Sequence, residues 1–107
     1  MKRGEVWWVN FDPSLGGEIR KTRPAVIISN DSSNLHMNRV QVIPATSKIG
    51  KLYPCEAYVT VQNQRSKVMA DQIMTVSKKR LLSRIEMLPH ETLLDINHIL
   101  KVQLGLL

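Results

Sequence analysis

The sequence predicts a mainly β protein with one C-terminal α-helix, folded as a small, partly open antiparallel β-barrel of the SH3-like or OB-like kind. Three observations support this class. Short runs rich in β-branched and aromatic residues recur between residues 5 and 76. The connections between these runs are too short for βαβ crossovers, and the one clear helical periodicity comes last. We expect the sheet to curl, because a flat one would leave its edges exposed.

The first two strands are expected on either side of a glycine-containing loop. Residues 5–11 (EVWWVNF) are rich in β-branched and aromatic side chains, and Pro13 then ends the run. Residues 14–17 (SLGG) are typical of a loop. Residues 23–29 (RPAVIIS) form an unbroken apolar run, which predicts a strand buried on both faces with Pro24 at its first ladder position.

The middle of the chain predicts one exposed loop and one more strand before a second loop. Residues 30–38 are polar, with three Asn and two Ser, and are expected to form an exposed loop. Residues 40–43 (VQVI) alternate in hydropathy and predict a third strand that runs on to residue 46, a neighbour of the strand at 23–29. Residues 47–51, around a glycine, predict the next loop.

Three further strand segments are expected before the helix. Residues 57–61 and 68–70 are predicted as the fourth and fifth strands, and residues 72–76 as a sixth strand or a continuation after a kink. Ser77 stands where an N-cap would, so a single helical turn is expected over residues 78–81.

The terminal helix is the clearest local prediction. Pro89 suits a first helical turn, and an apolar stripe at spacings of three and four residues follows: Leu93, Ile96, Leu100, Leu104 and Leu107. This stripe is expected to lie on the sheet. We expect one domain spanning residues 1–107.

Composition and charge restrict the classes of function that this chain can have. The chain has 107 residues, 43% of them hydrophobic, with 15 Lys or Arg against 9 Asp or Glu and a net charge of +6. We expect a cytoplasmic protein without a signal peptide or membrane span. The single Cys55 excludes an intrachain disulfide and is expected to be a small half-buried filler. The excess of positive charge suggests a polyanionic partner, although scattered cations such as Lys67 and Lys101 are expected simply to solvate the surface.

The sequence lacks the motifs of several common functional sites. The chain has no phosphate-binding Gly-x-x-x-x-Gly-Lys-Ser/Thr loop and no Gly-x-Ser-x-Gly elbow. His90-Glu91 begins like a zinc-protease motif, but Leu94 occupies the position of the second His. We therefore expect no metal and no cofactor.

The most unusual segment is residues 18–24 (EIRKTRP), where one acid and three cations crowd a loop that leads into a buried strand. A strand start can hold Arg23 rigidly, and a guanidinium can bind a phosphate through two parallel hydrogen bonds. If Glu18 folds back near Arg23, it can accept a proton. The alternative is a surface ion pair without function.

The chain resembles the MazF/PemK family of toxin endoribonucleases. The resemblance begins in residues 2–13 (KRGEVWWVNFDP) and in residues 16–18 (GGE) followed by 22–31 (TRPAVIISND). Residues 44–47 (PATS) and 70–73 (ADQI) continue it in the family's order and cover nearly the whole chain with the terminal helix.

The resemblance implies an SH3-like barrel that forms a homodimer and cleaves single-stranded RNA without a metal, leaving a 2′,3′-cyclic phosphate and a 5′-hydroxyl. It also implies a partner, a MazE-like antitoxin with an acidic segment. By position, Arg23 and Thr46 match the family's catalytic residues and Glu18 the proposed general base. Asp71 matches an acidic position given the base role in some members, and Gln72 accompanies it as a catalytic or RNA-binding candidate.

The expected RNA path is lined by side chains around these residues: Arg20, Lys21, Ser47, Lys48, Lys51 and Lys79. Trp7, Trp8 and Tyr53 are candidates for stacking on bases, but at least one Trp is expected in the core. Many members have Arg where this chain has Met74, so a contact made by that Arg is absent here.

Two alternatives remain from the sequence. The first is a non-enzymatic toxin of the CcdB type, which resembles the same barrel but binds DNA gyrase through a C-terminal Trp-Gly-Ile. This chain ends instead with residues 104–107, LGLL. The second is an RNA- or DNA-binding barrel without chemistry, which only the net charge supports.

Overall fold

The computed structural model describes residues 1–13 and 15–106 and contains, within them, one curled antiparallel sheet of seven strands and two α-helices. The strands and helices, in chain order, are β1 (Glu5–Asn10), β2 (Thr22–Ile27), α1 (Asp31–His36), β3 (Arg39–Thr46), β4 (Glu56–Val61), β5 (Gln64–Met69), the 3₁₀ turn η1 (Ala70–Gln72), β6 (Met74–Ser77), the 3₁₀ turn η2 (Lys78–Arg80), β7 (Leu81–Met87) and α2 (His90–Leu104).

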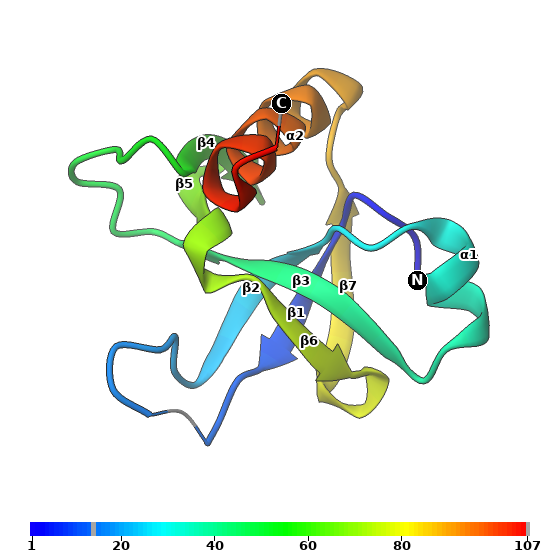
Figure 1. The fold of residues 1–107 in the computed structure, drawn as a ribbon. Helices are drawn as coiled ribbons and strands as arrows, with labels where there is room; N and C mark the ends of the chain where they lie inside the picture. Colours follow the sequence, from blue (N-terminus) through cyan, green and yellow to red (C-terminus); the bar gives the residue numbers. More distant parts are fainter. Residues whose placement is uncertain (14, 107) are drawn as a thin grey trace.

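The sheet is arranged around β3. Its strand order is β4-β5-β3-β2-β1-β7, and β6 also pairs with β3 (Figure 1). The expected pairing of the second and third strands is confirmed by the opposition of Val26 and Ile43. The first half of β3 pairs with β6 and its last two residues pair with β5. This division of β3 between two partners curls the sheet into a half-open barrel, as the sequence predicted.

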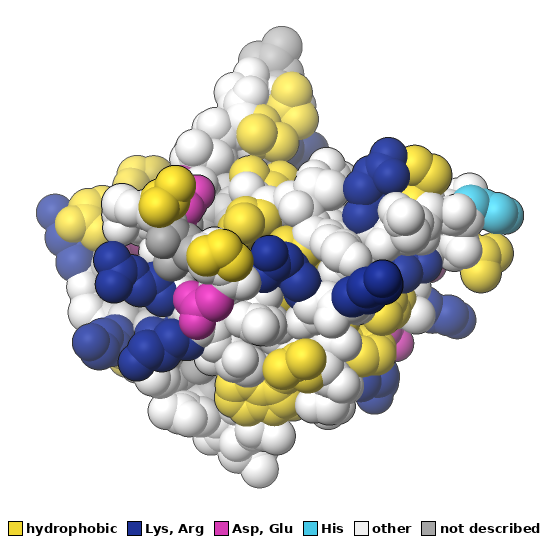
Figure 2. Space-filling view, turned by 90° about the horizontal axis from the view of Figure 1, so that it is seen from below, with side chains coloured by type: hydrophobic (Ala, Val, Ile, Leu, Met, Phe, Trp, Pro, Cys, Tyr) yellow, Lys and Arg dark blue, Asp and Glu magenta, His cyan; other side chains and the backbone are white. Residues whose placement is uncertain are grey.

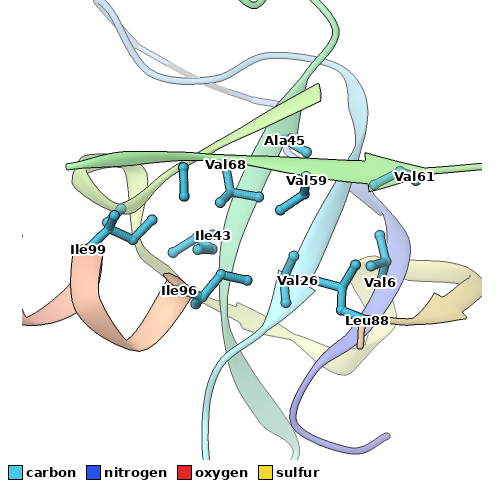
Figure 3. Close-up of a cluster of buried hydrophobic side chains, with 12 residues drawn as sticks. Val6, Val26, Ile43, Ala45, Val59, Val61, Val68, Leu88, Ile96 and Ile99 are labelled. Carbon is cyan, nitrogen blue, oxygen red and sulfur yellow. The ribbon is translucent and has the colours of Figure 1, made fainter. Parts of the chain in front are cut away.

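Two hydrophobic clusters lie on opposite sides of β2. Val26 belongs to a cluster that also includes Ile43, Val68 and residues of α2 (Figure 3), whereas Ala25 and Ile27 belong to the second cluster. Successive strand residues point to opposite faces, so the unbroken apolar run is buried on both, as predicted.

The terminal helix covers the first cluster. Ile96 and Ile99 are buried there, and Leu93 and Leu100 pack against the cluster as half-buried side chains. Leu104, expected on the same stripe, is 53% exposed because the last turn extends beyond the core side chains. Leu107 lies outside the described residues. Gly105 ends the helix in a left-handed conformation (φ 69°) that glycine adopts without strain.

The expected exposed loop at residues 30–38 is wrong, because α1 occupies most of it. Asn30 caps the helix: its side chain accepts a hydrogen bond from the backbone of Ser33 at 2.8 Å. Asn34 is buried, and its amide donates to the backbone carbonyl of Ser29 at 2.9 Å. Asn and Ser here stabilise a helix by capping and burial, although the same residues are typical of loops.

The strand boundaries differ from the sequence predictions at three places. Strand β2 begins at Thr22, so Pro24 is its third residue; it is tolerated because the ladder with β3 starts only at Ala25. The fifth and sixth segments are separate strands divided by η1. Strand β7 was not predicted at all, whereas the turn after Ser77 is confirmed, since its hydroxyl accepts from the Lys79 amide.

Within residues 1–13 and 15–106, no helix has the length and apolar character needed to cross a membrane.

Candidate functional site

The predicted site residues Arg23, Thr46 and Ser47 come together in one cleft of about 160 Å³. The cleft lies where β1, β2 and the end of β3 face the β4–β5 hairpin. Its remaining lining residues are Trp8, Thr22, Pro24, Ala45, Val61, Gln62, Gln64 and Ser66.

The strands hold the two principal side chains in place. Arg23 is half-buried, pairs with Val9 of β1, and its Nε donates to the backbone carbonyl of Arg20 at 3.3 Å. Thr46 is the last residue of β3 and is also half-buried; its Oγ1 accepts a hydrogen bond from the Lys48 amide at 3.2 Å. The Thr46 hydroxyl proton therefore remains available to a ligand. A guanidinium and a hydroxyl in one small cleft suit a phosphate group.

Glu18 lies on the exposed β1–β2 loop and is not among the residues that line the cleft. Its Oε1 accepts a hydrogen bond from the Leu15 amide at 2.6 Å, and its own amide donates to the Leu15 carbonyl at 3.1 Å. The carboxylate thus closes a local turn. The structure brings Arg23 and Thr46 together but leaves Glu18 on the neighbouring loop.

The side chain of Gln72 holds the β1–β2 loop against the sheet through two hydrogen bonds. Its Oε1 accepts from the Ile19 amide and its Nε2 donates to the Gly17 carbonyl, both at 3.3 Å. Gln72 belongs to η1, which packs against β3. The sequence named Gln72 as a catalytic or RNA-binding candidate; in this structure its side chain is engaged with the backbone on both sides of Glu18.

Asp71 lies in a different place from its neighbour. It is exposed and lines a separate hollow with Tyr53, Cys55 and Val102 at the C-terminal end of α2. The structure does not bring Asp71 into the cleft that holds Arg23. Cys55 is half-buried against the first cluster, which confirms its expected role as a filler.

The five cations expected along an RNA path are exposed and sit on the loops and the turn around the barrel: Arg20, Lys21, Lys48, Lys51 and Lys79. Figure 2, which views the molecule from below, shows many Lys and Arg side chains and few acidic ones on this face. Backbone bonds hold Lys21 in place: its amide donates to Asp12 Oδ1, and its carbonyl accepts from the Phe11 amide, both at 2.9 Å.

The expectation that Lys67 solvates the surface is wrong. Lys67 is only 8% exposed, and its Nζ donates to Glu56 Oε1 and to the Lys51 carbonyl, both at 2.9 Å. Glu56 Oε1 also accepts from the Tyr53 amide at 2.9 Å. This ion pair ties the loop that carries Lys48 and Lys51 to β5.

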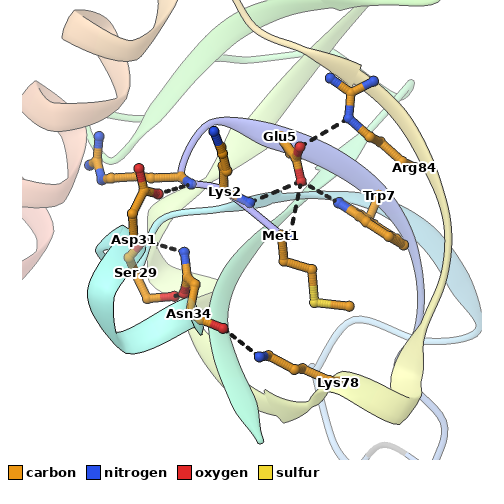
Figure 4. Close-up of polar contacts among 10 residues, drawn as sticks. Met1, Lys2, Glu5, Trp7, Ser29, Asp31, Asn34, Lys78 and Arg84 are labelled. Carbon is orange, nitrogen blue, oxygen red and sulfur yellow. Dashed lines mark hydrogen bonds and ion pairs between the residues drawn. The ribbon is translucent and has the colours of Figure 1, made fainter. Parts of the chain in front are cut away.

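The carboxylate of Glu5, a second acid with little exposure, accepts hydrogen bonds from residues of the N-terminal segment and of β7 (Figure 4). Burial raises the pKa of Glu5, but hydrogen bonds from the Trp7 indole, the Lys2 amide and Arg84, together with the nearby terminal amine, outweigh this and hold the pKa below its usual value. Trp7 packs against the second cluster while Trp8 lines the cleft; both are half-buried, so the Trp expected in the core lies at its edge.

Sequence reasoning missed the wall of the cleft contributed by the β4–β5 hairpin. Gln62, Gln64 and Ser66 form this wall, and no local motif marks them. Alternation along β5, which puts Gln64 and Ser66 on one face, was the only available signal. Across residues 1–13 and 15–106, no three His, Cys, Asp or Glu side chains gather in a group able to hold a metal ion.

Fold and site together define a small SH3-like half-barrel that is covered by a helix, has an arginine and a threonine in one cleft, and carries exposed cations on its loops. The family described as PemK-like, MazF-like toxins of type II toxin–antitoxin systems matches residues 2–104. The chain therefore belongs to this family, and the family expected from the sequence is confirmed.

Individual relatives agree with this assignment. The chain is 36% identical over 115 aligned residues to endoribonuclease MazF9 of Mycobacterium tuberculosis, covering 99% of this chain and 98% of the relative. A crystal structure of MazF from Deinococcus radiodurans is similar with a TM-score of 0.88 and 26% identity, over 99% of this chain and 97% of the other. A MazE–MazF structure from the same organism has a TM-score of 0.78 and 27% identity, over 100% and 98%.

Proposed function

We propose that this protein is a toxin endoribonuclease that cleaves single-stranded RNA in the cytoplasm without a metal ion. The observation that carries the proposal is the cleft in which Arg23 and Thr46 face the same small space. Support also comes from family membership and from the relative named as an endoribonuclease. Neither the CcdB-like reading nor the plain binding barrel has a comparable observation in its favour.

The proposed reaction is an in-line attack by a ribose 2′-oxygen on the adjacent phosphorus. The new O2′–P bond forms while the P–O5′ bond breaks, so the products carry a 2′,3′-cyclic phosphate and a 5′-hydroxyl. The guanidinium of Arg23 and the hydroxyl of Thr46 stabilise the charge that develops on the phosphorane oxygens. The leaving 5′-oxygen takes a proton from solvent, because an arginine with a pKa above ~12 is a poor acid.

Glu18 is the proposed acceptor of the 2′-hydroxyl proton. Its carboxylate bonds to the Leu15 amide in the free protein, so it must exchange this contact for the substrate when RNA enters the cleft. Catalytic hydrogen bonds often tighten only in the substrate complex. Asp71 is the weaker choice, since it lines a different hollow from Arg23.

We also propose a homodimer and a MazE-like antitoxin as partners. A net charge of +6 and the exposed cations favour an acidic antitoxin segment that competes with RNA. The related MazE–MazF structure from Deinococcus radiodurans supports such a pairing. Sedimentation at micromolar concentration tests the dimer, and a monomer there contradicts it.

The test of the catalytic assignment is a cleavage time course on a long single-stranded RNA with the wild type, Arg23→Ala and Thr46→Ala. Each substitution should lower the rate about 10²- to 10³-fold, the usual cost of removing a group that stabilises a transition state. Lys101→Ala, on the exposed face of α2, is the matched control and should cut normally. Undiminished cleavage by Arg23→Ala would remove the proposed mechanism.

A further inference from the structure

The β4–β5 hairpin forms one wall of the cleft that holds Arg23, and this wall has the chemistry of a base-binding site. It presents Gln62 and Gln64, while the indole of Trp8 lines the cleft from β1. Within the described residues, neither glutamine side chain has a hydrogen-bond partner in the protein, and both residues are exposed. Their amides are therefore free to bind a ligand.

The backbone holds Gln62 in an unusual conformation. Gln62 and Asn63 form a two-residue turn with φ values of 50° and 61°, between the paired residues Val61 and Gln64. Such turns favour Asn or Gly, and a glutamine at the first position is uncommon and costly. The amide of Gln62 donates to Glu86 Oε1 of β7 at 2.7 Å, which fixes the turn against the rest of the barrel.

Successive side chains of β5 point to opposite faces of the strand. Gln64 and Ser66 line the cleft, whereas Arg65 lies on the other side with its guanidinium 4.0 Å from the centre of the Tyr58 ring. The wall facing Arg23 is therefore uncharged. It suits a neutral hydrogen-bonding group next to the phosphate rather than a second phosphate.

We propose that Trp8, Gln62 and Gln64 form a subsite for one nucleobase of the RNA, beside the phosphate bound by Arg23. This inference rests on the proposed function. An indole provides a stacking surface for a base, and a glutamine amide, with a donor and an acceptor, can read a base edge. Trp8, Gln62 and Gln64 line the same cleft as Arg23 and Thr46, so a base held by them lies directly beside the bound phosphate.

The subsite makes the two glutamines determinants of specificity. Replacing either with methionine keeps the length of the side chain and removes the polar groups. Gln62→Met and Gln64→Met should each reduce discrimination at one position beside the cut by about 5- to 150-fold, the usual range for a bidentate base contact. Preferences at other positions should stay as in the wild type, because the remaining contacts are intact.

The experiment is the digestion of a randomised single-stranded RNA pool followed by sequencing of the cut ends. Gln41→Met, an exposed glutamine of β3 outside the cleft, is the matched control and should keep the wild-type pattern. Wild-type base preferences in both Gln62→Met and Gln64→Met, with normal cleavage, would overturn the subsite and leave the proposed nuclease activity standing.

A second readout does not depend on cleavage. Equilibrium binding of short oligoribonucleotides that differ at one base should discriminate between bases in the wild type and lose this discrimination in the double variant Gln62→Met/Gln64→Met. Trp8→Leu should weaken binding of every base about 5- to 150-fold, since stacking tolerates all bases. Equal wild-type affinity for all bases would overturn the subsite whether or not the RNA is cut.

Discussion

The side chain of Gln72 is hydrogen-bonded to both residues that flank Glu18. Its oxygen accepts from the Ile19 amide and its nitrogen donates to the Gly17 carbonyl, each at 3.3 Å. The Gln72 amide group therefore accepts one hydrogen bond from the loop backbone and donates another to it, as the backbone of a neighbouring strand would. Because Gln72 stands on η1 against β3, the position of Glu18 is linked to the strand that ends in Thr46.

Loss of this link should slow cleavage without unfolding the protein. Gln72→Leu removes two hydrogen bonds, each worth about 0.5–1.5 kcal/mol, and should lower the cleavage rate roughly 10-fold, since about 1.4 kcal/mol corresponds to one decade. Hydrogen exchange at the Ile19 amide should become faster in the same variant. Gln41→Leu serves as the control. An unchanged cleavage rate alongside faster exchange would show that Glu18 need not be held there.

The exposed lysines of the β3–β4 loop should contribute to RNA affinity through phosphate contacts. With an RNA that lacks the 2′-hydroxyl at the cut site, Lys48→Gln/Lys51→Gln should reduce the slope of log Kd against log salt concentration by roughly 0.7 per lost contact. Lys101→Gln on α2 should leave the slope unchanged. Identical slopes for all three proteins would exclude this loop from the RNA path.

The buried pair between Lys67 and Glu56 should stabilise the fold. Lys67→Met leaves the Glu56 carboxylate without its cation in a nearly buried site and should lower the free energy of unfolding by about 3–5 kcal/mol. The double variant Lys67→Met/Glu56→Gln should recover much of this loss, because the unpaired charge is gone while an acceptor for the Tyr53 amide remains. Urea denaturation measures both, and a double variant no more stable than the single one would contradict the charge-pairing account.

The stability conferred by Glu5 should depend on pH. Its pKa in the folded protein is lower than the ordinary value of 4.5, so its contribution is complete above pH 4.5 and is lost as pH falls through the folded pKa. The difference in unfolding free energy between the wild type and Glu5→Gln should therefore be largest at neutral pH and shrink below pH 4.5. A difference in unfolding free energy that stays the same between neutral and acidic pH would contradict this account.

The sequence predicted most of the strands and the helix because their signals are local. The apolar run of β2 and the stripe of α2 depend on neighbouring residues alone. Helix α1 was missed because its stability comes from Asn34, which is buried against Ser29. Strand β7 was missed because its charged residues have distant partners, as in the bonds from Arg84 to Glu5 and from the Gln62 amide to Glu86.

The same distinction applies to the site. Arg23 and Thr46 were named from their motifs, and the register of β2, β3 and β5 brings them into one cleft. The hairpin wall with Gln64 depends on how β5 pairs with the end of β3, which no local pattern encodes. The position of Glu18 on its loop likewise depends on Gln72, more than 50 residues away.

The most direct test of the central claim is to incubate the purified protein with a long single-stranded RNA in excess EDTA and determine the chemistry of the new ends. The account predicts discrete cuts with 5′-hydroxyl ends that accept a kinase label directly, and cyclic phosphates on the 3′ side, with cutting greatly slowed in Arg23→Ala. RNA that stays intact in the presence of the folded protein, or cuts that carry 5′-phosphates, would contradict it.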